Sequence, residues 1–349
     1  MTTIRVLFLT NDGEYCHRAA PYFAKYHPDI KPTFSASVQG VSEAISKKMY
    51  NVVLVGEEFE RENIIIPSGV AAAYLSETNS GNDINGLKSY CKYKSGDALY
   101  RIILSMFADV SNIQTVNANN FRIAAFTNAN GGAGSTTIAA AYAYRQALLG
   151  KKTLFFSFDP FDDCSDYLFD ITESGTLSDM IFIVKSGTAA KNASLKAAAL
   201  LKKDVSGVKF IDNCKDPYDF EALTAEHIEK MVDIISSADE FEYVVVDGSI
   251  FDERFRKFIL NRADELFIVA ENEKNSKSRL TKLLRFLSVL DKRENKDLVS
   301  RSALIFNKNS GASLSVSGIS VCGSVPKYKD SNVRNIANAA SRLNIWDNL

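Results

Sequence analysis

Residues 121–152 read FRIAAFTNANGGAGSTTIAAAYAYRQALLGKK, and this stretch decides the fold of the larger part of the chain. An apolar, strand-like run at 122–126 leads into a glycine-rich turn, and a helix-like run that Gly150 closes follows. Glycines let the backbone curl until several amide groups point inward, and the first turn of a helix adds partial positive charge. The stretch therefore predicts a phosphate-binding loop between a strand and a helix of an α/β domain.

The same alternation of short apolar strands and helices extends over the rest of the chain. The expected strands lie at residues 4–9, 51–55, 122–126, 153–158, 208–211, 243–247, 266–270, 303–306 and 319–321. A polar, asparagine-rich segment at 111–120 has no periodicity and predicts a linker. We therefore expect two doubly wound α/β domains, at 1–110 and 121–349, with an exposed helical excursion at 185–203.

Composition narrows the class of protein. The chain has 349 residues, with 41 basic and 42 acidic side chains and a formal charge of −1. This balance argues against a protein that mainly holds nucleic acid, which needs a basic excess. No apolar run approaches the roughly 20 residues of a membrane-spanning helix, and the N-terminus has no signal-peptide pattern. Five cysteines without a C-x-x-C pair argue against a disulfide framework or a zinc ribbon and favour the cytoplasm.

The glycine-rich loop resembles the deviant Walker A motif of the MinD/ParA class of dimeric ATPases, which reads K-G-G-x-G-K-T-T. The residues that the resemblance assigns to the nucleotide are Asn130, Gly131, Gly132, Ala133, Gly134, Ser135, Thr136 and Thr137. We expect the hydroxyl of Thr136 to bind Mg²⁺ and that of Thr137 to bind an inner phosphate. Asn130 and Ser135 replace the two lysines of the motif.

Further positions match the family at the expected distances, and they imply ATP and Mg²⁺ as cofactors. Asp247, after the run YVVV, is expected to hold the metal ion, as is Asp159, which is also the candidate catalytic residue. The alternative for Asp159 is a turn acid before a proline. Asn307 and Lys308 stand near the expected base, and Pro326 stands in the later loop that flanks it.

The loss of the two lysines predicts weak catalysis. A unit charge 4 Å from phosphate is worth about 4 kcal/mol at a surface-like dielectric, before desolvation is subtracted. Amides, the helix terminus and Mg²⁺ remain, so we expect ATP·Mg²⁺ binding with slow or absent hydrolysis. Lys274, Lys277 or Arg279 could supply the missing cation, either within the chain or across a dimer; a solvated charged loop is the alternative.

The N-terminal domain resembles a response-regulator receiver that lacks its phosphoacceptor. Gly56 occupies the acceptor position, and Glu57 and Glu58 follow it one residue or more out of place. Ser76 and Lys94 could fill the receiver's hydroxyl and lysine positions, and Asp12 with Glu57 is a candidate residual metal site. Without a carboxylate at position 56 no aspartyl phosphate can form there, so a docking or dimerisation module is expected.

Together the two domains resemble the TadZ/CpaE branch of pilus-assembly proteins. That resemblance implies a homodimer that localises the Tad/type IVb pilus secretion machinery at a cell pole, with the secretion ATPase and a polar landmark protein as partners. The alternative is a MinD/ParA-type positioning or partitioning ATPase that acts on membrane or DNA. The C-terminal segment carries few basic residues, so we expect core packing there and at most peripheral membrane contact.

Overall fold

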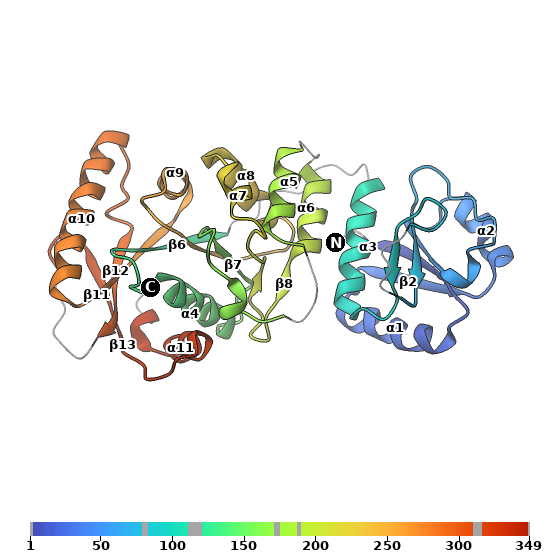
Figure 1. Cartoon of the computed structure of the whole chain (residues 1–349), viewed down its shortest axis with the longest axis horizontal. Coiled ribbons are helices and arrows are strands. Elements are labelled where there is room, and N and C mark those ends of the chain that lie inside the picture. The colour runs from blue at the N-terminus through green and yellow to red at the C-terminus, as the bar shows by residue number, and fades with distance from the viewer. Residues whose placement is uncertain are drawn as a thin grey trace. The chain divides into compact units, whose positions relative to one another are not determined.

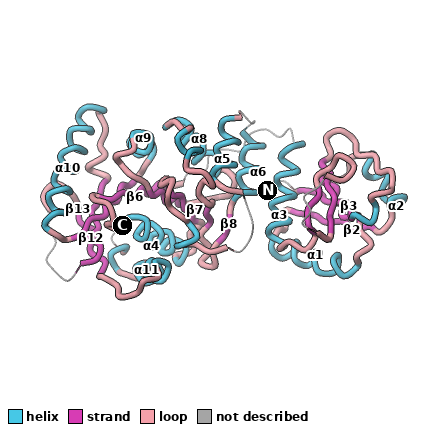
Figure 2. The backbone as a smooth tube through the Cα atoms, viewed as in Figure 1, coloured by secondary structure: helices cyan, strands magenta, loops and turns pink. Residues whose placement is uncertain are grey.

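The computed structural model describes residues 3–78, 83–110, 121–170, 175–186, 190–309 and 316–347. Contacts within the chain divide it into two units, and Figures 1 and 2 show that each is built around its own sheet flanked by helices. The predicted linker at 111–120 lies outside the described residues. Among the described helices, none is long and apolar enough to cross a membrane.

The first unit has a parallel sheet of five strands in the order β2-β1-β3-β4-β5. Its elements are β1 (Ile4–Leu9), α1 (Gly13–Tyr26), β2 (Ile30–Ser35), α2 (Val38–Ser46), β3 (Val52–Gly56), a 3₁₀ turn (Glu57–Phe59), β4 (Ala71–Ser76), β5 (Ser89–Cys91) and α3 (Gly96–Val110). Alternate residues of β1 serve two cores: Val6 and Phe8 pack with α1 and α3, while Leu7 and Leu9 pack with α2. The sheet is therefore covered on both faces, as the apolar strands predicted.

The second unit has an eight-stranded sheet in the order β13-β12-β11-β6-β10-β7-β9-β8, parallel except for the short antiparallel β8. Its first half comprises β6 (Arg122–Asn128), α4 (Ser135–Leu148), β7 (Thr153–Ser157), a 3₁₀ turn (Cys164–Asp166), α5 (Leu177–Lys185), α6 (Ala190–Leu200), β8 (Lys202–Lys203) and β9 (Lys209–Phe210). The sheet orders confirm the predicted class of two doubly wound α/β folds.

The remaining elements are α7 (Tyr218–Glu221), α8 (Ala225–Ser236), β10 (Tyr243–Asp247), α9 (Glu253–Arg262), β11 (Glu265–Glu271), α10 (Lys274–Glu294), β12 (Ser302–Asn309), β13 (Ser320–Pro326), α11 (Val333–Ala340) and a 3₁₀ turn (Asn344–Trp346).

Helix α4 fixes the position of the glycine-rich loop, because its alanine-rich body is almost entirely buried. Small side chains let α11 approach it closely, through Ala337 and Ala340. The ring of Trp346 packs edge-on against Tyr142, and its indole N–H donates to the carbonyl of Ala340 at 2.9 Å. Core packing of the C-terminal segment, as predicted, is confirmed.

The prediction of an exposed excursion at 185–203 is wrong in one respect. Residues 190–200 form a helix, but α6 buries Ala193 and Ala197 fully, and Lys202–Lys203 form the short strand β8. Nearly all of α6 belongs to the first unit, where Ala199 joins the core beside α3 and the ammonium of Lys196 lies 2.6 Å from the carboxylate of Asp109. Alanines four residues apart lie on one face of the helix, and this narrow face can pack closely. The prediction of exposure rested on the lysine-rich composition and did not take this spacing into account.

Candidate functional site

The glycine-rich loop joins β6 to α4 at the carboxyl end of the second sheet. Gly132 and Gly134 adopt φ angles of +79° and +86°, a left-handed conformation that favours glycine. A Cβ atom at Gly134 would also lie 2.5 Å from Nδ2 of Asn307, so both backbone and space require glycine there. The amide of Ala133 donates to the carbonyl of Asn130 at 3.2 Å and closes the turn. The first amides of α4 then have no acceptor within the helix and can bind an anion.

The end of β12 holds this loop from the side. Nδ2 of Asn307 donates to the carbonyl of Ala133 at 2.8 Å, and Nζ of Lys308 donates to the carbonyl of Gly132 at 2.6 Å. Lys308 has a φ of +54° and lies at a register shift between β12 and β13, which turns its side chain toward the loop. Its ammonium is also paired with Glu271 at 2.7 Å. Asn307 and Lys308, which were predicted to lie near the base, thus hold the phosphate loop in position.

A buried carboxylate lies at the start of α4. Oδ2 of Asp247 accepts a hydrogen bond from the hydroxyl of Thr136 at 2.7 Å, and the hydroxyl of Ser135 also bonds to this carboxylate. Asp247 is 2% exposed, and its Oδ1 is buried without a hydrogen-bond partner. Burial raises the pKa of Asp247 to about 7, against the effect of the two hydroxyls. The prediction that Thr136 and Asp247 lie together is confirmed.

The turn that follows β7 carries two aspartates with different surroundings. Asp159 is exposed, and its Oδ1 accepts from the amide of Phe161 at 3.0 Å, which is the turn-acid arrangement. Asp162 lies further inside, near the hydroxyl of Ser157, with its Oδ2 buried and without a partner. Burial raises the pKa of Asp162. The side-chain amide of Asn213 donates to the carbonyls of both aspartates, at 2.9 and 2.7 Å, and fixes the turn.

Other predicted site residues lie around the loop in less direct roles. The hydroxyl of Thr137 bonds to the phenol of Tyr167, and Nδ2 of Asn130 donates to the adjacent carbonyl of Gly131 at 3.3 Å. Pro326 is exposed at the end of β13, paired in register with the end of β12. On α10, Lys277 and Arg279 are exposed, while the side chain of Lys274 lies outside the described residues. Lys277 and Arg279 therefore stay a prediction as substitute cations.

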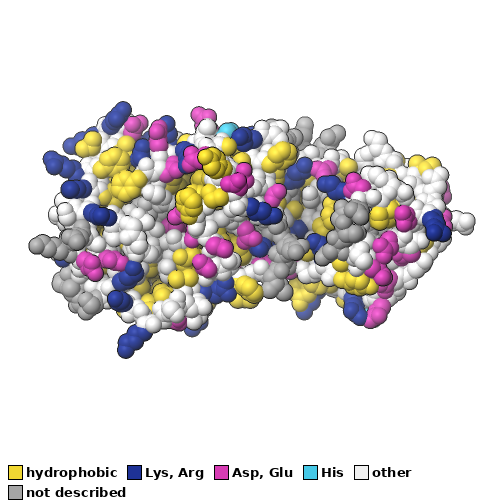
Figure 3. Space-filling model, in the orientation of Figure 1, with side chains coloured by type: hydrophobic (Ala, Val, Ile, Leu, Met, Phe, Trp, Pro, Cys, Tyr) yellow, Lys and Arg dark blue, Asp and Glu magenta, His cyan; other side chains and the backbone are white. Residues whose placement is uncertain are grey.

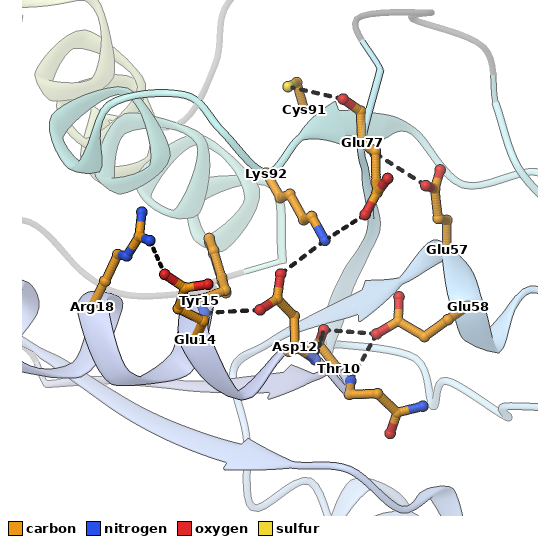
Figure 4. Close-up of polar contacts among 11 residues, drawn as sticks. Thr10, Asp12, Glu14, Tyr15, Arg18, Glu57, Glu58, Glu77, Cys91 and Lys92 are labelled. Carbon is orange, nitrogen blue, oxygen red and sulfur yellow. Dashed lines mark hydrogen bonds and ion pairs between the residues drawn. The ribbon is translucent and has the colours of Figure 1, made fainter.

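The corresponding end of the first sheet is filled by its own side chains, as Figure 4 shows. Oε1 of Glu58 accepts from the hydroxyl of Thr10 and from the amide of Asn11, both at 2.7 Å. A Cβ atom at Gly56 would lie 2.2 Å from Oε2 of Glu58. The carboxylate of Glu58 thus occupies the space beside the expected acceptor position. Burial pushes the pKa of Glu58 up, but the bonds from Thr10 and Asn11 leave it below its ordinary value.

Lys92, not Lys94, supplies the ammonium group at this end of the sheet. It lies 3.0 Å from Asp12 and 2.9 Å from Glu77 (Figure 4). Because β5 ends at residue 91, the lysine directly after the strand points inward, and the expectation for Lys94 was wrong by two residues. Bonds from the amide of Tyr15 and from Lys92 lower the pKa of Asp12.

The predicted residual metal pair of Asp12 and Glu57 does not form. Glu57 accepts from the amide of Glu77 at 3.1 Å, while Asp12 is bonded to Lys92 and to the start of α1. Among the described residues, neither domain has three His, Cys, Asp or Glu side chains placed to hold a metal ion.

The sequence matches two family models. Residues 121–300, more than half of the chain, match an AAA domain, and residues 2–108 match a TadZ-like receiver domain. The chain belongs to this AAA family of ParA/MinD type. Its N-terminal part is a TadZ-like receiver domain, so the resemblance drawn from the sequence is confirmed for both domains. No curated protein matches the chain.

Several solved structures resemble the ATPase-fold domain. A ParA family ATPase from Chlorobium tepidum is 20% identical over 66% of this chain and 96% of its own, with a TM-score of 0.52. A putative plasmid partition protein from Borrelia burgdorferi bound to AMPPNP is 15% identical over 63% and 90%, with a TM-score of 0.44. MinD from Pyrococcus horikoshii complexed with Mg-ADP is 17% identical over 63% and 86%, with a TM-score of 0.46. The Chlorobium structure shows that the domain has the ParA fold.

Two residues, Lys92 and Asp162, were missed from the sequence, and the role of a third, Glu58, was not predicted. Lys92 could have been found by taking the residue directly after a short strand. Asp162 stands in the acidic run FDPFDD, where the sequence does not show which carboxylate turns inward. Glu58 reaches back over its own turn, and nothing in the sequence predicts that reach.

Proposed function

We propose that the chain is an ATP·Mg²⁺-binding scaffold for Tad/type IVb pilus assembly that acts as a nucleotide-stabilised dimer with slow or absent hydrolysis. The observation that carries the proposal is the pair of Thr136 and Asp247 beside a glycine-rich loop whose conformation only glycine accommodates. The ParA fold and the TadZ-like receiver domain support the class of protein. We propose domains at 1–110 and 121–349, joined by a linker at 111–120; helix α6, although it falls in the second range, packs within the first unit.

The residues fit a magnesium ion. The orphaned Oδ1 of Asp247 is an oxygen ligand without a donor, and the hydroxyl of Thr136 lies next to it. Mg²⁺ prefers oxygen ligands and keeps several waters, so one carboxylate, one hydroxyl and phosphate oxygens suffice. When bound, the ion neutralises charge on the phosphates. The amides of residues 131–137 would hold the phosphates, and Asn307, Lys308 and Pro326 would flank the base.

Weak hydrolysis follows from the side chains that face the loop. Ser135 directs its hydroxyl to Asp247, and Asn130 donates to its own loop, so neither takes the place of a lysine. Asp159, the candidate catalytic residue, is exposed and holds the following turn. Without a lysine beside the outer phosphates, the transition state for phosphoryl transfer loses part of the charge stabilisation that Mg²⁺ alone does not supply.

Dimerisation is supported by aromatic side chains at the rim of the site. Phe161 is 85% exposed and Phe251 is 63% exposed, in the turns after the paired strands β7 and β10. Figure 3 shows hydrophobic side chains exposed in the area where Figure 1 draws α7 and α9. Exposed aromatic groups beside a ligand site are typical of interfaces. A second copy of the chain that covers the nucleotide is the occupant we propose.

The receiver domain would serve as a docking module in the cytoplasm. Gly56 cannot accept a phosphoryl group, and Glu58 fills the space beside it. We propose that the domain contacts the pilus secretion ATPase or a polar landmark protein, and that the dimer helps to place the secretion machinery at the cell pole.

Calorimetric titration tests the central step. We expect the full chain to bind ATP in the presence of Mg²⁺, with sedimentation velocity showing a dimer under the same conditions. Thr136→Val should weaken Mg²⁺-dependent binding at least tenfold, because it removes one ligand and one hydrogen bond to Asp247. Thr281→Val, on the exposed face of α10, is the matched control and should bind like wild type. No heat at millimolar ATP would refute the proposal.

A further inference from the structure

We infer that Asp162 is a second acidic residue of the divalent-ion site, which holds a metal-bound water opposite Asp247. The inference rests on the proposed function, since it needs a metal ion and nucleotide at the loop. It concerns a residue outside the glycine-rich loop and outside the strand that carries Asp247.

The first support is the pair of unsatisfied oxygens. Oδ2 of Asp162 and Oδ1 of Asp247 are both buried, and both lack a hydrogen-bond partner. Within the part of the chain that the structure describes, no salt bridge is found for either aspartate. Buried carboxylate oxygens are normally paired with donors or cations, because leaving them bare is costly. Two such oxygens beside one loop point to a missing cation with its water.

The second support is the way the backbone places Asp162. Ser157 and Asp247 are directly paired in register on the adjacent strands β7 and β10. Neighbouring strands lie about 4.8 Å apart, and the carboxylate of Asp162 is near enough to the hydroxyl of Ser157 for that hydroxyl to lower its pKa. Asp162 therefore lies in the turn that follows β7, close enough to Asp247 for its charge to raise the pKa of that carboxyl. The side-chain amide of Asn213 donates to the backbone carbonyl of Asp162 and holds the turn in this position.

The third support is the ligand count. Mg²⁺ commonly binds one or two carboxylates directly and keeps several waters, which outer acidic groups orient. Asp162 suits this outer position: Ser157 directs it, and its free oxygen can accept from a bound water. The exposed Asp159 has its Oδ1 engaged by a backbone amide.

The test measures metal affinity without relying on turnover. Mn²⁺ binding to the full chain with a non-hydrolysable ATP analogue is followed by electron paramagnetic resonance. Asp162→Asn should weaken Mn²⁺ about tenfold or more, as expected for an orienting outer-sphere group, while binding of metal-free analogue is retained. Asp163→Asn is the matched control, because that neighbouring carboxylate is exposed and accepts only from the amide of Ser165 in the contacts found. It should bind Mn²⁺ like wild type.

A relocated carboxylate separates a metal role from a structural one. The double variant Ser157→Asp with Asp162→Ser exchanges the hydroxyl and the carboxylate between the two positions. The negative charge is kept but now lies at the end of β7, so this variant should recover most of the Mn²⁺ affinity. Asn213→Ala, which frees the turn and keeps the acid, should give an intermediate loss. Fluorescence of Trp346 verifies that each variant is folded. Wild-type Mn²⁺ affinity in Asp162→Asn overturns this inference alone, whereas a wild-type chain that binds no analogue overturns the proposed function as well.

Discussion

Replacing Asp247 with asparagine should stabilise the metal-free, nucleotide-free protein at pH 8, although it removes the group that we propose binds the metal ion. Burial raises the pKa of Asp247 from 3.8 to about 7, so the folded state holds a proton that the unfolded state has lost. Stability is therefore lost as the pH rises from about 4 to about 7, and the full cost is present above pH 7. Asparagine does not ionise and avoids this cost.

The magnitude follows from the difference between the two pKa values, which corresponds to roughly 4 kcal/mol above pH 7. The asparagine oxygen can still accept from Thr136, but its amide group replaces the oxygen that has no partner, at a cost of about 1–3 kcal/mol. The net gain in the free energy of unfolding is then about 1–3 kcal/mol at pH 8. At pH 5 folded Asp247 is protonated, so the gain should shrink by about 2–3 kcal/mol.

Trp346 makes the assay specific for the ATPase-fold domain. It is the only tryptophan of the chain and is 5% exposed in the core around α4. Urea unfolding is followed by Trp346 fluorescence in the presence of a chelator, and it gives the free energy of unfolding at pH 5, 6.5 and 8. Thr281→Val is the control: this exposed site carries no titratable group, so its difference from wild type should not change with pH. A stability difference for Asp247→Asn that is the same at pH 5 and pH 8 would refute the reasoning.

Three further predictions concern the loop, the dimer face and the receiver domain. Ser135→Lys should tighten ATP binding at least tenfold in calorimetry, because it returns a cation to the phosphates, and Ser135→Ala should not. Replacing Phe161 and Phe251 with serine should abolish the ATP-dependent dimer in sedimentation. Because both side chains are exposed, the free energy of unfolding should not fall, and an unchanged dimer would contradict the proposed dimer face. Gly56→Ala should destabilise the receiver domain by about 1–2 kcal/mol by displacing Glu58, but should stabilise it by about 0.5 kcal/mol in a Glu58→Ala background, as hydrogen exchange would report. If Gly56→Ala changed the stability in the same direction in both backgrounds, Glu58 would not fill the space beside position 56.

The sequence alone predicted the fold where buried strands are long and apolar. The run of valines before Asp247 and the glycine-rich loop lie where the pattern put them, because both faces of a parallel strand must be apolar. Strands β2, β4, β5 and β8 were not predicted. Strand β2 lies at a sheet edge and contains Pro32, which edges tolerate, and β5 has three half-buried residues.

Site residues could be predicted where their position at the end of a strand determines where they lie. They could not be predicted where a side chain has several possible hydrogen-bond partners. Thr136 and Asp247 meet because a loop and a strand end at the same edge of the sheet. The direction of an acid within a turn depends on hydrogen bonds from distant residues, such as those of Asn213 to the turn that holds Asp159 and Asp162. Local sequence does not contain that information.

The path of the chain through α6 has a consequence for synthesis on the ribosome. The receiver domain's sheet and α3 are complete by residue 110, yet the core beside α3 includes Ala199. Domains fold as units while the N-terminal part emerges first, so the last layer of the first unit arrives only after the phosphate loop has been made. A chain stopped at residue 110 would leave apolar side chains of α3 without this cover, and expression of such a fragment should yield a less soluble product than the full chain.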